Sequence, residues 1–291
     1  MGNAWRDRRA NPWLDRRVLC YAHQGGAREG PSSTLWAMER ALAHGADALE
    51  LDVHATSDGE LVVCHDSTVD RTTNGSGPIA FLTLDEVRRL DNAYWWVPGE
   101  VVDHGRPPED YPLRGRAPLD RTLCIATLDE VLEAFPTTFL NLDIKQTAPA
   151  VPAYEEMVAR TLRAHGRSDD VIVASFNDAA TDAFRTFAPE VGTSAGTLGT
   201  AQLWHAAHEG LPLPDVPCVA LQVPVATAGV TILDEILIEA GHGAGIAIHA
   251  WTIDDADEMG RLVGMGVDGV MSDVPSLLAG VVAEEGATFQ P

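Results

Sequence analysis

Short apolar runs alternate with longer amphipathic segments along most of the chain. The short runs have the length and apolar or β-branched composition of buried strands. Eight of them occur: Val18–Ala22, Ala48–Val53, Phe139–Ile144, Val171–Ser175, Gly192–Ala195, Cys218–Val223, Ile246–Trp251 and Asp268–Met271. The longer segments have the pattern of helices: Thr34–His44, Val151–His165, Ala179–Phe187, Ala201–His208, Ile232–Ala240, Ala256–Val263 and Ser276–Ala283.

Strands that alternate with helices in this way form parallel βα units. Eight such units in a chain of 291 residues predict a closed (β/α)₈ barrel, a fold that typically takes about 250 residues. We therefore expect an α/β protein built as a single TIM-barrel domain over residues 1–291.

The regular alternation is interrupted between residues 56 and 124. The turn residues Thr56–Glu60 lie between two alternating apolar runs and predict a β-hairpin. Pairing around that turn places Asp52 opposite His65 and brings His65 to the end of the second strand. Residues 82–90 predict a short helix. We interpret 56–124 as an insertion at the barrel mouth, made of a hairpin and a long loop, and not as a second domain.

The charge balance narrows the possible ligands. The chain has 43 acidic and 20 basic residues, a formal net charge of −23. A phosphate polymer would be repelled, so we expect no nucleic-acid partner. The sequence has no run of about 18 apolar residues and no signal-peptide pattern, which predicts a cytoplasmic protein without membrane insertion. A small phosphorylated substrate is compatible with this charge if a cation or a local positive group lies in its site.

Acidic side chains lie near the carboxyl ends of two predicted strands. Glu50 and Asp52 are two residues apart on one strand and point to the same face, while Asp143 is on the next barrel strand. In a (β/α)₈ barrel these strand ends form the functional face. Three convergent carboxylates would repel one another without a cation, and their hard oxygens suit Mg²⁺ or Ca²⁺. We predict a divalent-metal site at Glu50, Asp52 and Asp143.

Two histidines are expected beside this cluster. His23 follows the first strand, and His65 reaches the same edge through the hairpin. Histidine changes its charge near neutral pH, so this pair could supply a general acid and a general base. His54 is expected beyond the barrel rim, and the remaining histidines are interpreted as solvated surface groups.

Other candidates are found at the same face. Lys145, the only lysine of the chain, could hold a phosphate or the carboxylates, or act as a Schiff-base nucleophile. Gln222 and Trp251 end later strands and could contact substrate. In the insertion, Trp95 and Trp96 could either pack against the barrel or form an apolar wall of the site.

Several motifs resemble those of the glycerophosphodiester phosphodiesterase family. They are AHQGG at 22–26, GADALELDVHATSDGELVVCHDSTVDRTTNGSG at 45–77, LNLDIK at 140–145, HAWTI at 249–253 and GVDGVMSDVP at 266–275. The resemblance extends from about residue 18 to residue 275. It implies a (β/α)₈ barrel with a segment inserted after the second strand, in agreement with the strand count.

The resemblance also implies roles for the candidate residues and a reaction. Glycerophosphodiesters would be cleaved to glycerol 3-phosphate and an alcohol, through a cyclic phosphate that water then opens. The implied roles are metal ligands (Glu50, Asp52, Asp143), an acid–base pair (His23, His65), a phosphate contact (Lys145) and a glycerol contact (Trp251).

Three positions depart from the family pattern. Gln24 stands where the family usually has arginine, so its expected phosphate contact carries no charge, and Arg28 is a candidate substitute. Ser32 replaces a glutamate. Asp143 replaces the usual glutamate among the metal ligands and is shorter by one methylene.

Alternative functions stay open at this stage. The same chemistry could cleave lysophospholipids if Trp95 and Trp96 line the mouth. A glycosidase could use Glu50 and Asp52 as its carboxylate pair. An aldolase would use Lys145, and a non-catalytic phosphate-ligand binding protein would need neither histidine. The sequence predicts no oligomeric state.

Overall fold

A computed structural model describes residues 11–14, 18–145 and 154–289. Its central element is a ring of parallel strands in the order β6-β5-β4-β2-β1-β11-β10-β7. A parallel bridge between Ser194 and Ala220 joins the two ends of this order, so the eight strands form a nearly closed TIM-like barrel. The strands are β1 (Leu19–His23), β2 (Ala48–Ala55), β4 (Phe139–Ile144), β5 (Val171–Ala174), β6 (Gly192–Thr193), β7 (Ala220–Val223), β10 (Ala247–Ala250) and β11 (Gly269–Ser272).

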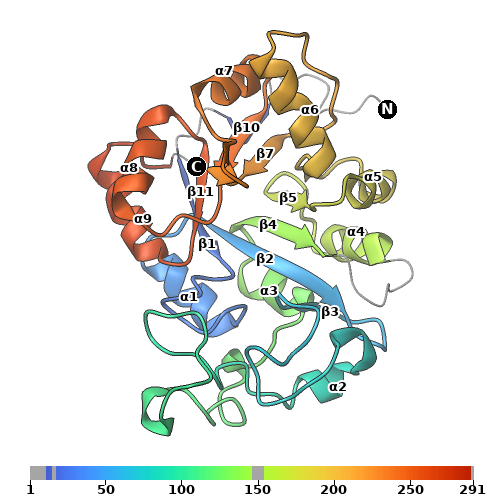
Figure 1. Ribbon diagram of the computed structural model, residues 1–291. Coiled ribbons are helices and arrows are strands. Elements are labelled where there is room, and N and C mark those ends of the chain that lie inside the picture. The colour runs from blue at the N-terminus through green and yellow to red at the C-terminus, as the bar shows by residue number, and fades with distance from the viewer. Residues whose placement is uncertain (1–10, 15–17, 146–153, 290–291) are drawn as a thin grey trace.

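Helices surround the strands, as Figure 1 shows. They are α1 (Leu35–Ala43), α3 (Leu128–Ala134), α4 (Tyr154–Ala164), α5 (Asp178–Phe187), α6 (Thr197–His208), α7 (Glu235–Gly243), α8 (Ala256–Met265) and α9 (Pro275–Glu284). The predicted start of α4, residues 151–153, lies outside the described residues. None of the helices in the described ranges has the length and apolar character needed to cross a membrane.

One end of the barrel interior is filled by apolar side chains. Trp13, Leu19, Tyr21, Ile172 and Phe289 belong to one buried cluster. The alternation of a β-strand then directs the later residues of the same strands toward the opposite, carboxyl end. In β1 the inward side chains are Leu19, Tyr21 and, last along the strand, His23. The polar candidate residues therefore lie at the carboxyl end of the barrel, opposite the apolar cluster.

The hairpin forms at the predicted turn, but its register differs by one residue. Strand β3 (Leu61–Val63) pairs antiparallel with β2 and places His54 opposite Val62. The Thr56 N–H donates to Glu60 O at 2.9 Å, and Gly59 has a φ of 86°. The loop therefore has three residues, with glycine at the left-handed position that such loops favour. As a result the Asp52 carbonyl accepts from the Cys64 N–H, and not from His65 as the predicted pairing would require.

The rest of the 56–124 segment contains short elements: η3 (Ile79–Phe81), α2 (Leu84–Val87), η4 (Pro108–Asp110) and η5 (Arg121–Leu123), where η is a 3₁₀ helix. In Figure 1 the segment extends beside β2 and β3 at one side of the barrel. Its aromatic side chains pack locally. Trp96 is buried and donates to the Ala27 carbonyl, and Trp95 stacks on His104 with ring centroids 4.4 Å apart.

Two differences from the predicted elements bear on the site. A small hairpin of β8 (Ala226–Thr227) and β9 (Val230–Thr231) follows β7, where no element was predicted. Helix α7 begins three residues later than predicted, because the Asp234 side chain accepts from Leu237 N at 3.0 Å and caps the helix there.

Candidate active site

A cavity of about 520 Å³ opens at the carboxyl ends of the barrel strands. It brings together residues from β1, β2, β4, β7 and the hairpin, which are far apart in the sequence. Eight of the nine predicted site residues line it: His23, Glu50, Asp52, His65, Asp143, Lys145, Gln222 and Trp251. The exception is Gln24.

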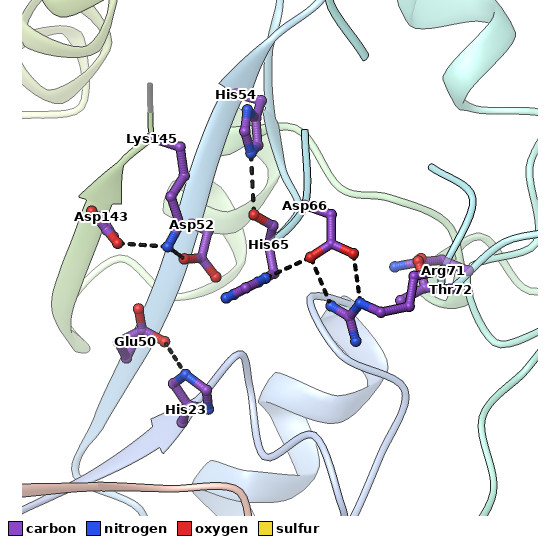
Figure 2. Close-up of polar contacts among 11 residues, drawn as sticks. His23, Glu50, Asp52, His54, His65, Asp66, Arg71, Thr72, Asp143 and Lys145 are labelled. Carbon is purple, nitrogen blue, oxygen red and sulfur yellow. Dashed lines mark hydrogen bonds and ion pairs between the residues drawn. The ribbon is translucent and has the colours of Figure 1, made fainter. Parts of the chain in front are cut away.

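The carboxylates of β2 and β4 lie side by side. Asp52 and Asp143 are direct register partners, and Lys145 follows two residues later. The Lys145 ammonium lies 2.8 Å from Asp52 Oδ1 and 2.7 Å from Asp143 Oδ2, so it bridges the two side chains. Figure 2 shows this bridge, with Glu50 on the same strand as Asp52. The chain thus supplies one positive charge of its own to the carboxylate group.

One ammonium does not satisfy this group. Asp52 Oδ2 and Asp143 Oδ1 are buried and have no hydrogen-bond partner. Burial, together with repulsion from Asp52, raises the pKa of Glu50 to about 7. Within the described ranges no group of three or more histidine, cysteine, aspartate or glutamate side chains already has the spacing of a metal site. The site therefore has surplus oxygen acceptors and surplus negative charge, and its carboxylates are held around the Lys145 ammonium.

The environment of Lys145 keeps its amine protonated. Burial alone lowers the pKa of Lys145, but Asp52 and Asp143 outweigh it and raise the pKa above the ordinary value. A Schiff-base lysine needs the opposite shift. This environment argues against the aldolase hypothesis.

His23 lies between two carboxylates. Its Nδ1 is 2.6 Å from Asp273 Oδ1, and its Nε2 is 3.8 Å from Glu50 Oε2. Burial by itself lowers the pKa of His23, but Glu50 and the hydrogen bond to Asp273 raise it to about 9. The imidazole is therefore held in its protonated form at neutral pH. Asp273 is fixed in turn, because its backbone N–H donates to Asp254 Oδ1 at 2.8 Å.

His65 has a carboxylate partner of a different kind. Its Nδ1 lies 2.7 Å from Asp66 Oδ1, and Arg71 Nε donates to the other Asp66 oxygen at 2.6 Å. The hydrogen bonds from His65 and Arg71 hold the pKa of Asp66 well below its ordinary value. In Figure 2 the His65 ring extends from Asp66 toward Glu50 and Asp52. Since Arg71 neutralises Asp66, the charge around His65 differs from that around His23.

Sequence reasoning missed both carboxylates that orient the histidines. Asp66 directly follows His65, and Asp273 lies just after β11 in the motif GVMSDVP. A histidine whose Nδ1 is held by a carboxylate presents Nε2 in a fixed direction and tautomer. An aspartate adjacent to a motif histidine was the available signal for Asp66. The contact of Asp273 crosses 250 residues and depends on the closure of the barrel.

Two other histidines are placed differently from the expectation. His54 is 1% exposed, and its Nε2 lies 3.3 Å from the His65 carbonyl, so it is buried behind His65 and not beyond the rim. His249 was interpreted as a surface group, which is wrong: it is fully buried inside the barrel. Its ring lies against Tyr21 with centroids 5.2 Å apart. Both follow from the inward alternation of their strands.

Gln24 contributes through its backbone. Its N–H donates to Glu50 Oε2 at 3.1 Å, while the residue has a φ of 52° and is 5% exposed. Its side chain does not line the cavity, so the phosphate contact stays a prediction. Arg28, the candidate substitute, donates from Nε to Gly99 O at 2.8 Å and is not among the lining residues.

The remaining candidates form the opposite walls. Gln222 donates from Nε2 to Asn141 Oδ1 at 2.6 Å, which fixes its amide at the cavity. Trp251 packs edge-on against Phe176 with ring centroids 5.6 Å apart. Trp95 and Trp96 do not line the cavity, so of their two alternative roles the structure favours packing within the insertion over an apolar wall of the site.

The chain matches the glycerophosphoryl diester phosphodiesterase family over residues 23–277. A glycerophosphodiester phosphodiesterase of Caldanaerobacter subterraneus is 31% identical over 275 residues, which cover 93% of this chain and 100% of that protein. A putative glycerophosphoryl diester phosphodiesterase of Silicibacter pomeroyi has the same fold, with a TM-score of 0.74 at 20% identity over 95% of this chain and 96% of the other.

An Oleispira antarctica phosphodiesterase, solved in complex with the product sn-glycerol-3-phosphate, gives a TM-score of 0.70 at 23% identity. The match covers 93% of this chain and 99% of that one. These structures confirm the predicted barrel fold, and the family match and the full-length relative confirm the enzyme class. The chain belongs to the glycerophosphoryl diester phosphodiesterase family.

Proposed function

We propose that this enzyme hydrolyses glycerophosphodiesters to glycerol 3-phosphate and an alcohol, with a divalent cation and two histidines. The observation that carries the proposal is the shared cavity. It holds two histidines, each hydrogen-bonded to an aspartate, beside a carboxylate group that Lys145 satisfies only in part.

Glu50, Asp52 and Asp143 would hold the cation. The fit rests on the two buried carboxylate oxygens that have no partner and on the hardness of oxygen donors, which suits Mg²⁺ or Ca²⁺. A bound divalent cation would withdraw charge from the phosphoryl oxygens and so favour attack on phosphorus. Lys145 adds a second positive charge near the same oxygens, and together the charges let an anionic substrate enter a protein of net charge −23.

His23 is proposed as the general acid. The Glu50 and Asp273 carboxylates beside it stabilise the imidazolium, and Asp273 binds Nδ1, which leaves the Nε2 proton for the leaving oxygen. His65 is proposed as the general base. Asp66 orients it through Nδ1, and Arg71 fixes Asp66 in turn, which leaves Nε2 of His65 free to accept the hydroxyl proton.

The reaction then proceeds in two balanced steps. His65 takes the proton of the glycerol hydroxyl next to the ester, whose oxygen attacks phosphorus, and His23 gives its proton to the departing alcohol. Water opens the cyclic phosphate with the roles reversed: His23 takes a proton from the attacking water, and His65 returns one to the glycerol oxygen. Gln222 and Trp251 line the cavity where they can contact the glycerol.

Release of glycerol 3-phosphate from glycerophosphocholine tests this proposal. We expect release with Mg²⁺ or Ca²⁺, its loss in EDTA, and a fall of about 10²- to 10⁴-fold in kcat for His23→Ala. His44→Ala replaces an exposed histidine at the end of α1 and serves as the matched control. Binding of glycerophosphocholine without turnover under any metal would instead favour the non-catalytic phosphate-ligand binding protein.

Leaving-group dependence separates the two histidine roles. Nitrophenolate leaves a nitrophenyl ester of glycerol phosphate without taking a proton, so His23→Ala should recover most of the rate of the first step, measured as a burst of nitrophenolate release. His65→Ala should not, because the attacking hydroxyl still needs its base. The reverse pattern would exchange the two assignments.

A further inference from the structure

The cavity extends well beyond its charged end. On the side of β5, β6 and β7 it is bounded by apolar side chains, which we call the apolar arm: Phe176, Ala195, Ala201, Trp204, Val223 and Ile232. The whole cavity, about 520 Å³, falls in the range of about 300–1,000 Å³ typical of sites for drug-sized ligands. The arm is continuous with the space around His23 and Lys145.

Five parts of the fold build the arm. They are the loop after β5 (Phe176), the loop after β6 (Ala195), helix α6 (Ala201, Trp204), the end of β7 (Val223) and the residue after the β8–β9 hairpin (Ile232). The hairpin is anchored because the Ile232 N–H donates to the Val225 carbonyl at 2.9 Å. The residues of the arm are therefore positioned by helices, strands or backbone hydrogen bonds.

The arm is not built for a charged group. The other described polar side chains that line the cavity around it are hydroxyls, at Ser194, Thr197, Thr200 and Thr227, and none of them is ionisable, so this side offers no countercharge. The start of α6 could otherwise attract an anion, but Asp178 already accepts from Leu198 N and Gly199 N, both at 2.9 Å. An apolar, uncharged group is the ligand that these walls fit.

Exposed apolar side chains also stand on the parts of the fold that build the arm. Phe176 is 59% exposed and Leu198 is 62% exposed. The N–H of Thr197, the residue before Leu198, donates to the Phe176 carbonyl at 3.0 Å and links the two segments. Val230, at the tip of the hairpin, is 48% exposed. A hydrocarbon chain leaving the arm would cover such side chains and gain the free energy of their burial.

The apolar arm lies across the barrel from His23. The leaving oxygen must lie within reach of His23 on β1, and β1 is opposite β6 in the eight-strand ring. A substrate whose leaving oxygen lies beside His23 therefore has room to extend its retained part, the glycerol and any group esterified to it, across the cavity toward β6 and the apolar arm.

We infer that the apolar arm binds a single hydrocarbon chain carried on the glycerol, so that the substrates include single-chain glycerophosphodiesters of the lysophospholipid class. The inference rests on the proposed function. For 1-acyl lysophosphatidylcholine, the free sn-2 hydroxyl oxygen forms a bond to phosphorus and the phosphorus–choline oxygen bond breaks. His65 takes the hydroxyl proton and His23 protonates choline. Water then opens the cyclic phosphate to give lysophosphatidic acid.

The test compares kcat/KM for glycerophosphocholine, 1-hexanoyl and 1-decanoyl lysophosphatidylcholine, all as monomers with metal present. Burial of each methylene can raise kcat/KM up to about fourfold, so the decanoyl substrate should exceed the hexanoyl one about tenfold or more. Ala201→Trp fills the arm from an exposed position of α6 and should remove this gain. Phe176→Ala should reduce it, whereas Phe81→Ala, a matched exposed phenylalanine at 66%, should leave it intact.

The outcomes are distinguishable. Glycerophosphocholine cleaved without any gain from chain length would overturn the inference and leave the proposed function standing. A gain that survives Ala201→Trp, or one that appears only when the chain is on the leaving alcohol, would also overturn it. Failure to cleave any of the three substrates with any metal would overturn both.

Discussion

Replacing His249 by glutamine is expected to make the fold less sensitive to acid. Burial lowers the pKa of His249 from 6.5 to about 4 in the folded protein. An unfolded chain has an ordinary histidine there, which binds its proton near pH 6.5. Between these two values the unfolded state binds more protons than the folded state, so stability falls as pH falls. This residue alone accounts for a loss of about 2 kcal/mol between pH 7.5 and pH 5.0.

Urea unfolding followed by tryptophan fluorescence at these two pH values measures the effect. The informative quantity is the difference between wild type and His249→Gln, since other groups titrate in both proteins. Glu50 is one of them, with the opposite sign: its pKa is raised to about 7, so its protonation favours the folded state as pH falls. His205→Gln, at an exposed position of α6, should show the wild-type pH dependence. Equal pH dependence of wild type and His249→Gln would refute the reasoning.

Other substitutions test the packing and charge of the site. Lys145→Met leaves two buried carboxylates without their ammonium and should cost about 3 kcal/mol in urea unfolding, partly restored by excess Mg²⁺ or Ca²⁺; no restoration would contradict a cation at that pair. Asp66→Asn should lower kcat about 10²- to 10⁴-fold by misorienting its histidine, and an unchanged kcat would exclude that role. Gly269→Ala brings a methyl group 2.9 Å from the His249 ring and should lower the free energy of unfolding by about 1–3 kcal/mol. Gly264→Ala has open space around the new methyl group and should leave stability unchanged. Equal urea midpoints for the two variants would refute the clash.

The barrel could be predicted from the sequence because its signals are local. Each predicted strand coincides with an observed one to within a few residues, since buried parallel strands are continuous apolar runs. The β8–β9 hairpin could not be found this way. Its two-residue strands, Ala226–Thr227 and Val230–Thr231, are exposed and too short to show a period.

The site was predicted at the level of strand ends, and its details depend on tertiary contacts. Alternation placed Glu50, Asp52 and Asp143 on one wall, and in the register Asp52 pairs with Asp143 while Glu50 pairs with Asn141. The same alternation, applied to HAWTI, would have directed His249 inward with Trp251. The contact of His23 with Asp273 and the bridge of Lys145 depend on distances across the barrel, which no local pattern encodes.

The single lysine of this chain makes the site spectroscopically addressable. Because Lys145 is the only lysine in the sequence, isotope-labelled lysine supplied during expression would enter the protein at this one position. A ¹³Cε-lysine label would therefore give one side-chain resonance, located between Asp52 and Asp143. Any ion or phosphate that enters the site must change the surroundings of that amine, so one NMR signal could report occupancy of the cavity without a chromogenic substrate.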